Sequence, residues 1–78
     1  MSHDISIDEL QNTIAPLKGY VGRKIQHRKT LGWYRIIGLQ FREADLSIEF
    51  TYETCHRDPV RFSRPIAELL DGRFQIGE

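Results

Sequence analysis

The spacing of apolar residues changes along this chain, and the change limits the folds open to it. Ile7, Leu10, Ile14 and Leu17 recur at three- and four-residue intervals, which is typical of one face of a helix. Apolar and polar residues alternate over 46–53, which is typical of a strand with one buried face. A helical segment followed by strands predicts an α+β or mostly β protein.

The N-terminal segment, residues 1–19, carries signals for both ends of a helix. Ser6 and Glu9 have the spacing of a capping box, in which each side chain accepts a hydrogen bond from a backbone N–H of the first turn. Pro16 lacks an N–H and clashes with the preceding turn, so the regular helix is expected to end near Ala15.

The remaining residues, 23–78, read as short strands with one helical turn. Aromatic and β-branched residues fill 33–42, and a further strand begins at Val60. Pro65 followed by Ile66–Leu70 predicts a short helical turn at 65–70, and Asp71-Gly72 predicts a turn into a last strand. With 78 residues, we expect one domain in which the N-terminal helix packs on a small, strongly bent antiparallel barrel of four to five strands.

The two central strands predict a particular hairpin register. Apolar residues then face one another on one side and polar residues on the other. The expected pairs are Phe41 with Leu46, Leu39 with Ile48, Ile37 with Phe50, Arg42 with Asp45, and Tyr34 with Glu53.

Charge is segregated along the chain although the formal net charge is zero. Residues 18–42 contain seven of the eleven basic residues and no acid, and 43–53 contain four acids and no base. Such a field can steer a partner even when the total cancels. If the acidic strand lies beside the basic arm, however, the two neutralise each other as surface ion pairs.

The basic segment has the composition of a nucleic-acid surface. Arg23, Lys24, Arg28 and Lys29 lie close enough to contact phosphates, and the adjacent Trp33 and Tyr34 provide aromatic rings on which a base can stack. The pI near 6.8 is low for that function. The other interpretation is a protein-binding surface anchored by the exposed aromatic ring.

Arg57, Arg61 and Arg64 form a second basic group. On a strand, Arg61 points away from the face that carries Val60 and Phe62. Arg64 before Pro65 is expected to be structural, bonding a backbone carbonyl or a strand carboxylate.

The sequence offers little catalytic or metal-binding chemistry. Cys55 and His56 are adjacent, so on a strand their side chains point to opposite faces and the histidine is badly placed to activate the thiol. One cysteine and three histidines lack the spacing of a zinc site. We therefore expect no enzyme, cofactor or metal.

Four segments resemble a small uncharacterised bacterial and phage domain family whose pattern runs H-x-K, Y-R-V-L-G, V-V-Y and W-V-R-P. They are His27-x-Lys29, residues 34–38, Tyr52 and residues 62–65, and the resemblance spans about 25–66. Residues 42–45 depart from the H-S-E-T element of that family, and Phe62 replaces its tryptophan. The resemblance implies an SH3-like barrel and carries no function.

The function expected from the sequence is a small, non-enzymatic, cytoplasmic binding module that contacts a protein partner, or forms a homodimer, and does not enter a membrane. Nucleic-acid binding is the alternative. The apolar helix stripe either packs on the barrel or docks on another chain. The candidate binding residues are Arg23, Lys24, Arg28, Lys29, Trp33, Tyr34 and Arg61.

Overall fold

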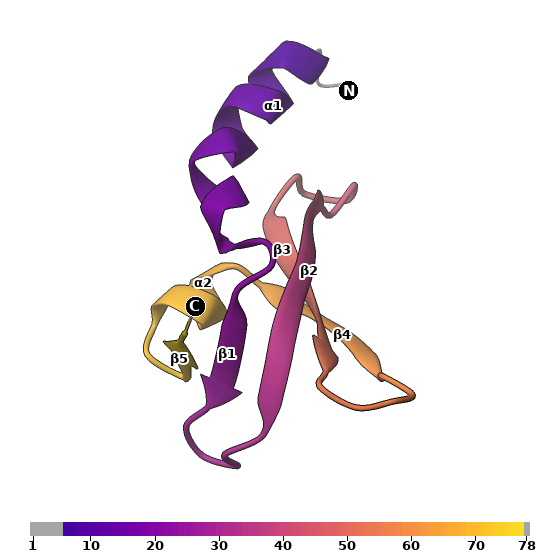
Figure 1. Ribbon diagram of the computed structural model, residues 1–78. Coiled ribbons are helices and arrows are strands. Elements are labelled where there is room, and N and C mark those ends of the chain that lie inside the picture. The colour runs from indigo at the N-terminus through magenta and orange to yellow at the C-terminus, as the bar shows by residue number, and fades with distance from the viewer. Residues whose placement is uncertain (1–5, 78) are drawn as a thin grey trace.

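The computed structural model describes residues 6–77 as a small α+β fold built on one five-stranded antiparallel sheet (Figure 1). The elements in chain order are α1 (Ile7–Ile14), η1 (Ala15–Tyr20), β1 (Lys24–His27), β2 (Trp33–Phe41), β3 (Ile48–Thr54), β4 (Arg61–Pro65), α2 (Ala67–Leu70) and β5 (Phe74–Ile76). The α+β, mostly β class expected from the sequence is confirmed. No helix in these residues is long and apolar enough to cross a membrane.

The N-terminal helix begins and ends where its capping signals predict. The Ser6 side chain accepts a hydrogen bond from the backbone N–H of Glu9, 3.1 Å away. After Ile14 the backbone tightens into the 3₁₀ helix η1, which carries Pro16 in its first turn. Ile14 is buried, but α1 projects past the end of the sheet and leaves Ile7 67% exposed (Figure 1).

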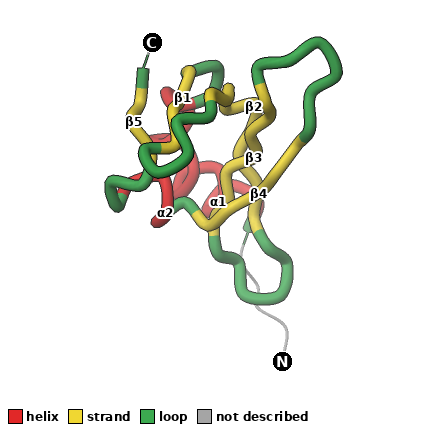
Figure 2. Tube along the Cα trace, turned by 90° about the horizontal axis from the view of Figure 1, so that it is seen from below, coloured by secondary structure: helices red, strands yellow, loops and turns green. Residues whose placement is uncertain are grey.

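The strands are ordered β4-β3-β2-β1-β5, with β4 and β5 at the two edges. Viewed from one end, they form an arc, and α2 lies near its opening and contacts both edge strands (Figure 2). The short helix follows Pro65, as predicted, and the turn after it contains Gly72 at φ +95°, a backbone conformation that glycine adopts without strain. The sheet in residues 6–77 is open, so closure into a barrel stays a prediction.

The predicted register of the β2–β3 hairpin is wrong. Leu39 pairs with Phe50 and Phe41 with Ile48, so the true register is shifted by two residues. A shift of two keeps side chains on their predicted faces, because side chains alternate with period two, and this holds for residues 38–41 of β2. The loop between β2 and β3 is therefore longer than predicted. It includes Leu46, which adopts a left-handed conformation (φ 57°) and does not start β3.

A bulge in β2 overturns a second detail of that register. The pairing shifts by one residue between Ile36 and Gly38, so Ile36, not Ile37, faces the core opposite Tyr52. Ile36 is fully buried. The predicted pairs of Tyr34 with Glu53 and Ile37 with Phe50 are replaced as well. Arg35 is the residue opposite Glu53, and Tyr34 lies opposite Thr54.

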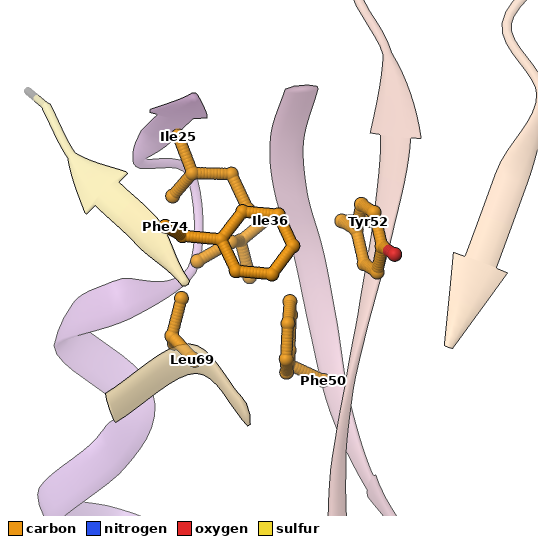
Figure 3. Close-up of a cluster of buried hydrophobic side chains, with 6 residues drawn as sticks. All are labelled: Ile25, Ile36, Phe50, Tyr52, Leu69 and Phe74. Carbon is orange, nitrogen blue, oxygen red and sulfur yellow. The ribbon is translucent and has the colours of Figure 1, made fainter. Parts of the chain in front are cut away.

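The core lies on the concave face of the sheet (Figure 3). Its six buried side chains come from four strands and α2; they are Ile25, Ile36, Phe50, Tyr52, Leu69 and Phe74. Phe50 and Tyr52 stack with ring centroids 5.0 Å apart, and Phe74 meets both rings edge to face, at 5.8 and 5.7 Å. The last strand thus completes the core that the first strands begin.

Candidate binding site

The structure distributes the seven predicted binding residues over separate surfaces. Lys24 and Trp33 lie on the outer, convex face of the sheet, and Arg28 and Lys29 lie in the turn between β1 and β2. The remaining three, Arg23, Tyr34 and Arg61, have contacts of other kinds. The basic segment is therefore not one contiguous surface.

On the outer face, Trp33 is an exposed aromatic ring beside a cation. Its ring is 48% exposed, and the Nζ atom of Lys24 lies 5.8 Å from the ring centroid. The neighbouring Arg35 donates a hydrogen bond to the carbonyl oxygen of Gly22, 2.9 Å away. The prediction that one of the two adjacent aromatic residues faces outward is confirmed for Trp33.

Three of the predicted residues make structural contacts. Arg23 donates from Nε to the carbonyl oxygen of Gly77 at 2.7 Å, which fixes the end of the chain beside β1. The ring of Tyr34 lies on the core face, 5.2 Å from that of Tyr52. Arg61 pairs with Glu53 at 3.2 Å on the far edge of the sheet.

Five basic side chains surround a hollow of about 500 Å³ beside the core. They are His27, Arg28, Lys29, Arg64 and Arg73. The hollow lies where the β1–β2 turn meets the loop between α2 and β5, and the backbone N–H of Arg28 donates to the carbonyl oxygen of Arg73 at 2.9 Å. We call these five residues the basic hollow.

Arg64 is the most firmly held member of the basic hollow. Its guanidinium donates to the hydroxyl oxygen of Tyr52 at 2.7 Å and to Glu68 at 2.8 Å, and it lies 5.5 Å from the centroid of the Phe74 ring. The hydrogen bond with Tyr52 has the largest effect and raises the pKa of Arg64, and Glu68 raises it further although burial opposes both. Arg64 bonds within the fold, as expected, but the expected partners are wrong: they are a tyrosine hydroxyl and a helix carboxylate, and not a backbone carbonyl or a strand carboxylate.

Two carboxylates hold Arg73 in place. Its Nε atom lies 2.9 Å from Asp71, and another nitrogen of the guanidinium lies 3.3 Å from Glu68. Glu68 therefore pairs with Arg64 and Arg73 together. The four arginine and lysine side chains of the basic hollow outnumber these two carboxylates, which leaves an excess of two positive charges.

His27 presents one ring nitrogen to its own turn. The backbone N–H of Thr30 donates to Nδ1 of His27 at 3.3 Å, and the ring meets Phe74 edge to face at 5.0 Å. Because Nδ1 accepts, the neutral ring carries its proton on Nε2. His27 is thus a hydrogen-bond donor at the rim.

The carboxylates of β3 pair with basic residues that lie outside the β1–β2 turn. Glu49 pairs with Arg42 at 3.7 Å and Glu53 with Arg61 at 3.2 Å. Within residues 6–77, neither Arg28 nor Lys29 forms an ion pair. The positive field of the turn is therefore not cancelled by the acidic segment that follows it in sequence.

Exposed apolar residues gather at the same end of the sheet. Leu31 (64% exposed) lies in the β1–β2 turn, and Val60 (54%) and Phe62 (44%) lie where β4 begins. The β1–β2 turn and the β3–β4 loop both lie at the lower end of the molecule (Figure 1). This end combines positive charge with exposed apolar surface.

Cys55 and His56 lie in the exposed β3–β4 loop and not on a strand. In the part of the chain that the structure describes, no group of three or more His, Cys, Asp or Glu side chains is placed to hold a metal ion.

Sequence reasoning identified Arg28 and Lys29 but did not assign His27 or Arg73 to a site. The pairing of β1 with β5 sets His27 opposite Phe74 and so brings Arg73 to the turn. No local pattern indicates that pairing. No family model matches the chain, and no curated protein or solved structure is significantly similar to it.

Proposed function

We propose that this domain is a non-enzymatic binding module that holds an acidic segment of a protein partner at the basic hollow. The observation that carries the proposal is the convergence of five basic residues, from the end of β1 and the turn after it, β4 and the loop before β5, beside one hollow. An excess of two positive charges attracts carboxylates and steers their approach.

The apolar residues at this end favour a protein over a nucleic acid. Leu31 and Val60 are aliphatic, so they offer no ring on which a base can stack. Together with Phe62 they suit leucine or aromatic side chains interspersed among the acids of a peptide. A partner segment with both acidic and apolar residues therefore matches the surface best.

Nucleic-acid binding is the second candidate, supported by Trp33, which is exposed beside Lys24. A strand stacked on Trp33 lies on the outer face, however, whereas Arg64 and His27 project from the concave face. A single nucleic-acid strand that contacts both Trp33 and these basic residues must cross the edge of the β1–β2 turn. The geometry thus separates Trp33 from the basic hollow.

The proposal involves no catalytic step and needs no cofactor. Glu68 and Asp71, the carboxylates beside the hollow, accept hydrogen bonds from arginines. Carboxylates held in this way position the guanidinium groups. Binding is the function that these contacts serve.

For the fold, we propose that the sheet closes into an SH3-like barrel. The strand order β4-β3-β2-β1-β5, with a short helix between the last two strands, supports it. In such a barrel α2 fills the gap between the edge strands, and the turns at one end form the binding surface.

The test is a fluorescence-anisotropy titration of the full chain with two labelled probes, a peptide of alternating Glu and Leu and a single-stranded oligothymidylate, each at low and high salt. We expect the peptide to bind more tightly. The double variant Arg28→Glu/Lys29→Glu should weaken peptide binding by about tenfold or more, because it reverses two unpaired charges of the hollow. Lys24→Glu, on the outer face, is the matched control and should change peptide binding little.

Other outcomes are equally informative. Tighter oligothymidylate binding that Trp33→Ala weakens would establish the second candidate instead. Lys24→Glu changes the net charge by two units and the double variant by four, so a loss of binding free energy in Lys24→Glu about half that in the double variant would show that only the overall charge matters. If neither probe binds at low salt, the proposal is wrong.

A further inference from the structure

The side chains that line the basic hollow offer hydrogen-bond donors to a ligand. Arginine and lysine carry donors only, and the acceptor nitrogen of His27 already receives the backbone N–H of Thr30. Within residues 6–77, Glu68 and Asp71 hold two of the arginines in place but do not themselves line the hollow. A ligand that enters the hollow must therefore bring acceptor atoms, which favours an oxyanion.

Two of the arginine side chains form a wall of donors whose position the fold fixes. One terminal nitrogen of Arg64 and one of Arg73 lie 2.8 and 3.3 Å from the same oxygen atom of Glu68. These two nitrogens are therefore at most 6.1 Å apart, the sum of the two distances.

Most of the N–H groups in this wall are free. A guanidinium carries five N–H groups, and Arg64 uses two of them, on Tyr52 and Glu68. Arg73 has carboxylate partners for at most two, Asp71 and Glu68. Each guanidinium keeps at least three N–H groups for a ligand, and little freedom is lost on binding because the side chains are already held.

The turn after β1 supplies the excess charge. The two carboxylates that hold Arg64 and Arg73 balance the charges of that pair. Arg28 and Lys29 form no ion pair within residues 6–77, so the excess of two positive charges belongs to the turn. The hollow thus combines a wall of positioned donors with two uncompensated charges.

A phosphate monoester matches both features. Near neutral pH it carries a charge of about −1.5 to −2 and three strong acceptor oxygens. Its oxygens accept parallel N–H groups from a guanidinium, and its charge balances the excess of the turn. A single carboxylate offers two oxygens and one negative charge, and each phosphodiester of a nucleic acid also carries one charge. Either of these leaves part of the positive charge uncompensated.

We propose that the basic hollow binds a phosphorylated side chain of the partner segment. This inference rests on the function proposed above and names the group that the hollow recognises. Arg64 and Arg73 bind the phosphate oxygens, and Arg28 and Lys29 balance the remaining charge. Leu31, at the same end of the molecule, contacts an apolar residue that flanks the phosphorylated one. Phosphorylation of the partner therefore strengthens binding.

The test is a fluorescence-anisotropy titration of the full chain with two labelled peptides of equal net charge. One is the alternating Glu and Leu peptide with a phosphoserine at its centre. The other has serine at that position and two further Glu residues at its ends. We expect the phosphopeptide to bind about tenfold more tightly, because at equal charge the two differ in the group that meets the arginine wall.

A pair of matched variants tests the wall itself. Arg73→Lys keeps the positive charge but removes the guanidinium fork, so it should reduce the preference for the phosphopeptide at least ~3-fold. Arg61→Lys, the same substitution on the far edge of the sheet, is the control and should leave the preference unchanged. Both side chains are more than half exposed, so neither substitution disturbs the core.

Four results would overturn the inference, and they differ in what they leave standing. Equal affinity for the two peptides, lost from both in Arg28→Glu/Lys29→Glu, would leave the proposed function intact. Binding of neither peptide would remove the proposed function as well. Tighter binding of the single-stranded oligothymidylate than of the phosphopeptide would favour the second candidate function. Displacement of the phosphopeptide by inorganic phosphate at a similar concentration would assign the hollow to the free ion and not to a partner segment.

Discussion

The Nε atom of Arg64 donates a hydrogen bond to the hydroxyl oxygen of Tyr52, 2.7 Å away. The contact joins the core to the candidate site, since the Tyr52 ring is 4% exposed and Arg64 lines the basic hollow. The two residues lie diagonally across β3 and β4, where Arg64 faces Phe50 in the register. The position of the guanidinium is therefore set by a core side chain.

Tyr52→Phe should lower the free energy of unfolding by about 1 kcal/mol. The substitution keeps the packing of the ring but removes the hydroxyl oxygen that accepts the hydrogen bond from Nε of Arg64. A charged donor makes the bond stronger than a neutral one, and the 33% exposure of the Arg64 side chain reduces the loss. Urea denaturation monitored by circular dichroism measures it. Tyr20→Phe, which removes a hydroxyl outside this contact, is the control, and an equal loss there would contradict the prediction.

Ile36→Val should cost about 1 kcal/mol of unfolding free energy, because it removes a methylene from a fully buried side chain. The same substitution at Ile37, which is half-buried at the bulge, should cost less than about 0.5 kcal/mol. Denaturation curves of the two variants test the position of the bulge directly. A larger loss at Ile37 than at Ile36 would mean that Ile37 faces the core and that β2 has no bulge there.

Local signals in the sequence predicted the fold elements well. The cap at Ser6, the end of the helix before Pro16 and the turn at Gly72 all appear in the structure. Each depends on residues within one or two turns of one another, so the sequence contains what decides them. The bulge at Ile37 and the left-handed Leu46 were missed, because apolar residues in these positions look the same as strand residues.

The candidate site was predicted only in part, for a similar reason. Arg28 and Lys29 are close in sequence, and their positive charge is evident there. Arg73 reaches the same hollow only because β5 returns to pair with β1. Trp33 was grouped with the turn because it is near in sequence, yet strand alternation sets its side chain on the outer face.

Asp45→Asn should destabilise the protein near neutral pH and have a smaller effect in acid. The backbone N–H and then the hydroxyl of Ser47 donate to the Asp45 carboxylate, at 3.0 and 2.8 Å, and lower the pKa of Asp45. A lowered pKa in the folded state adds stability above the unfolded pKa of about 4, and this stability disappears as the pH falls through the folded value. Denaturation at several pH values should show the two proteins converging.

Glu43→Gln is the control for that experiment, since Glu43 is an exposed acid in the same loop. Its effect on stability should be small. A pH dependence that Glu43→Gln alters as much as Asp45→Asn would mean that the loop responds to overall charge and not to the Asp45–Ser47 contact.

Trp33 and Tyr34 are adjacent aromatic residues with opposite orientations, and truncating each should have a different effect. Trp33→Ala removes an exposed ring and a cation–π contact with Lys24, at a cost of about 0.5–1 kcal/mol of unfolding free energy. Tyr34→Ala removes a ring that meets Tyr52, Phe62 and Phe74 edge to face, so it should cost at least ~2 kcal/mol. Urea denaturation of both variants, followed by peptide titration of Trp33→Ala, separates the two faces. Unaltered peptide affinity in Trp33→Ala is the expected result, because the ring lies across the sheet from the basic hollow, and a large loss would place the binding surface on the convex face.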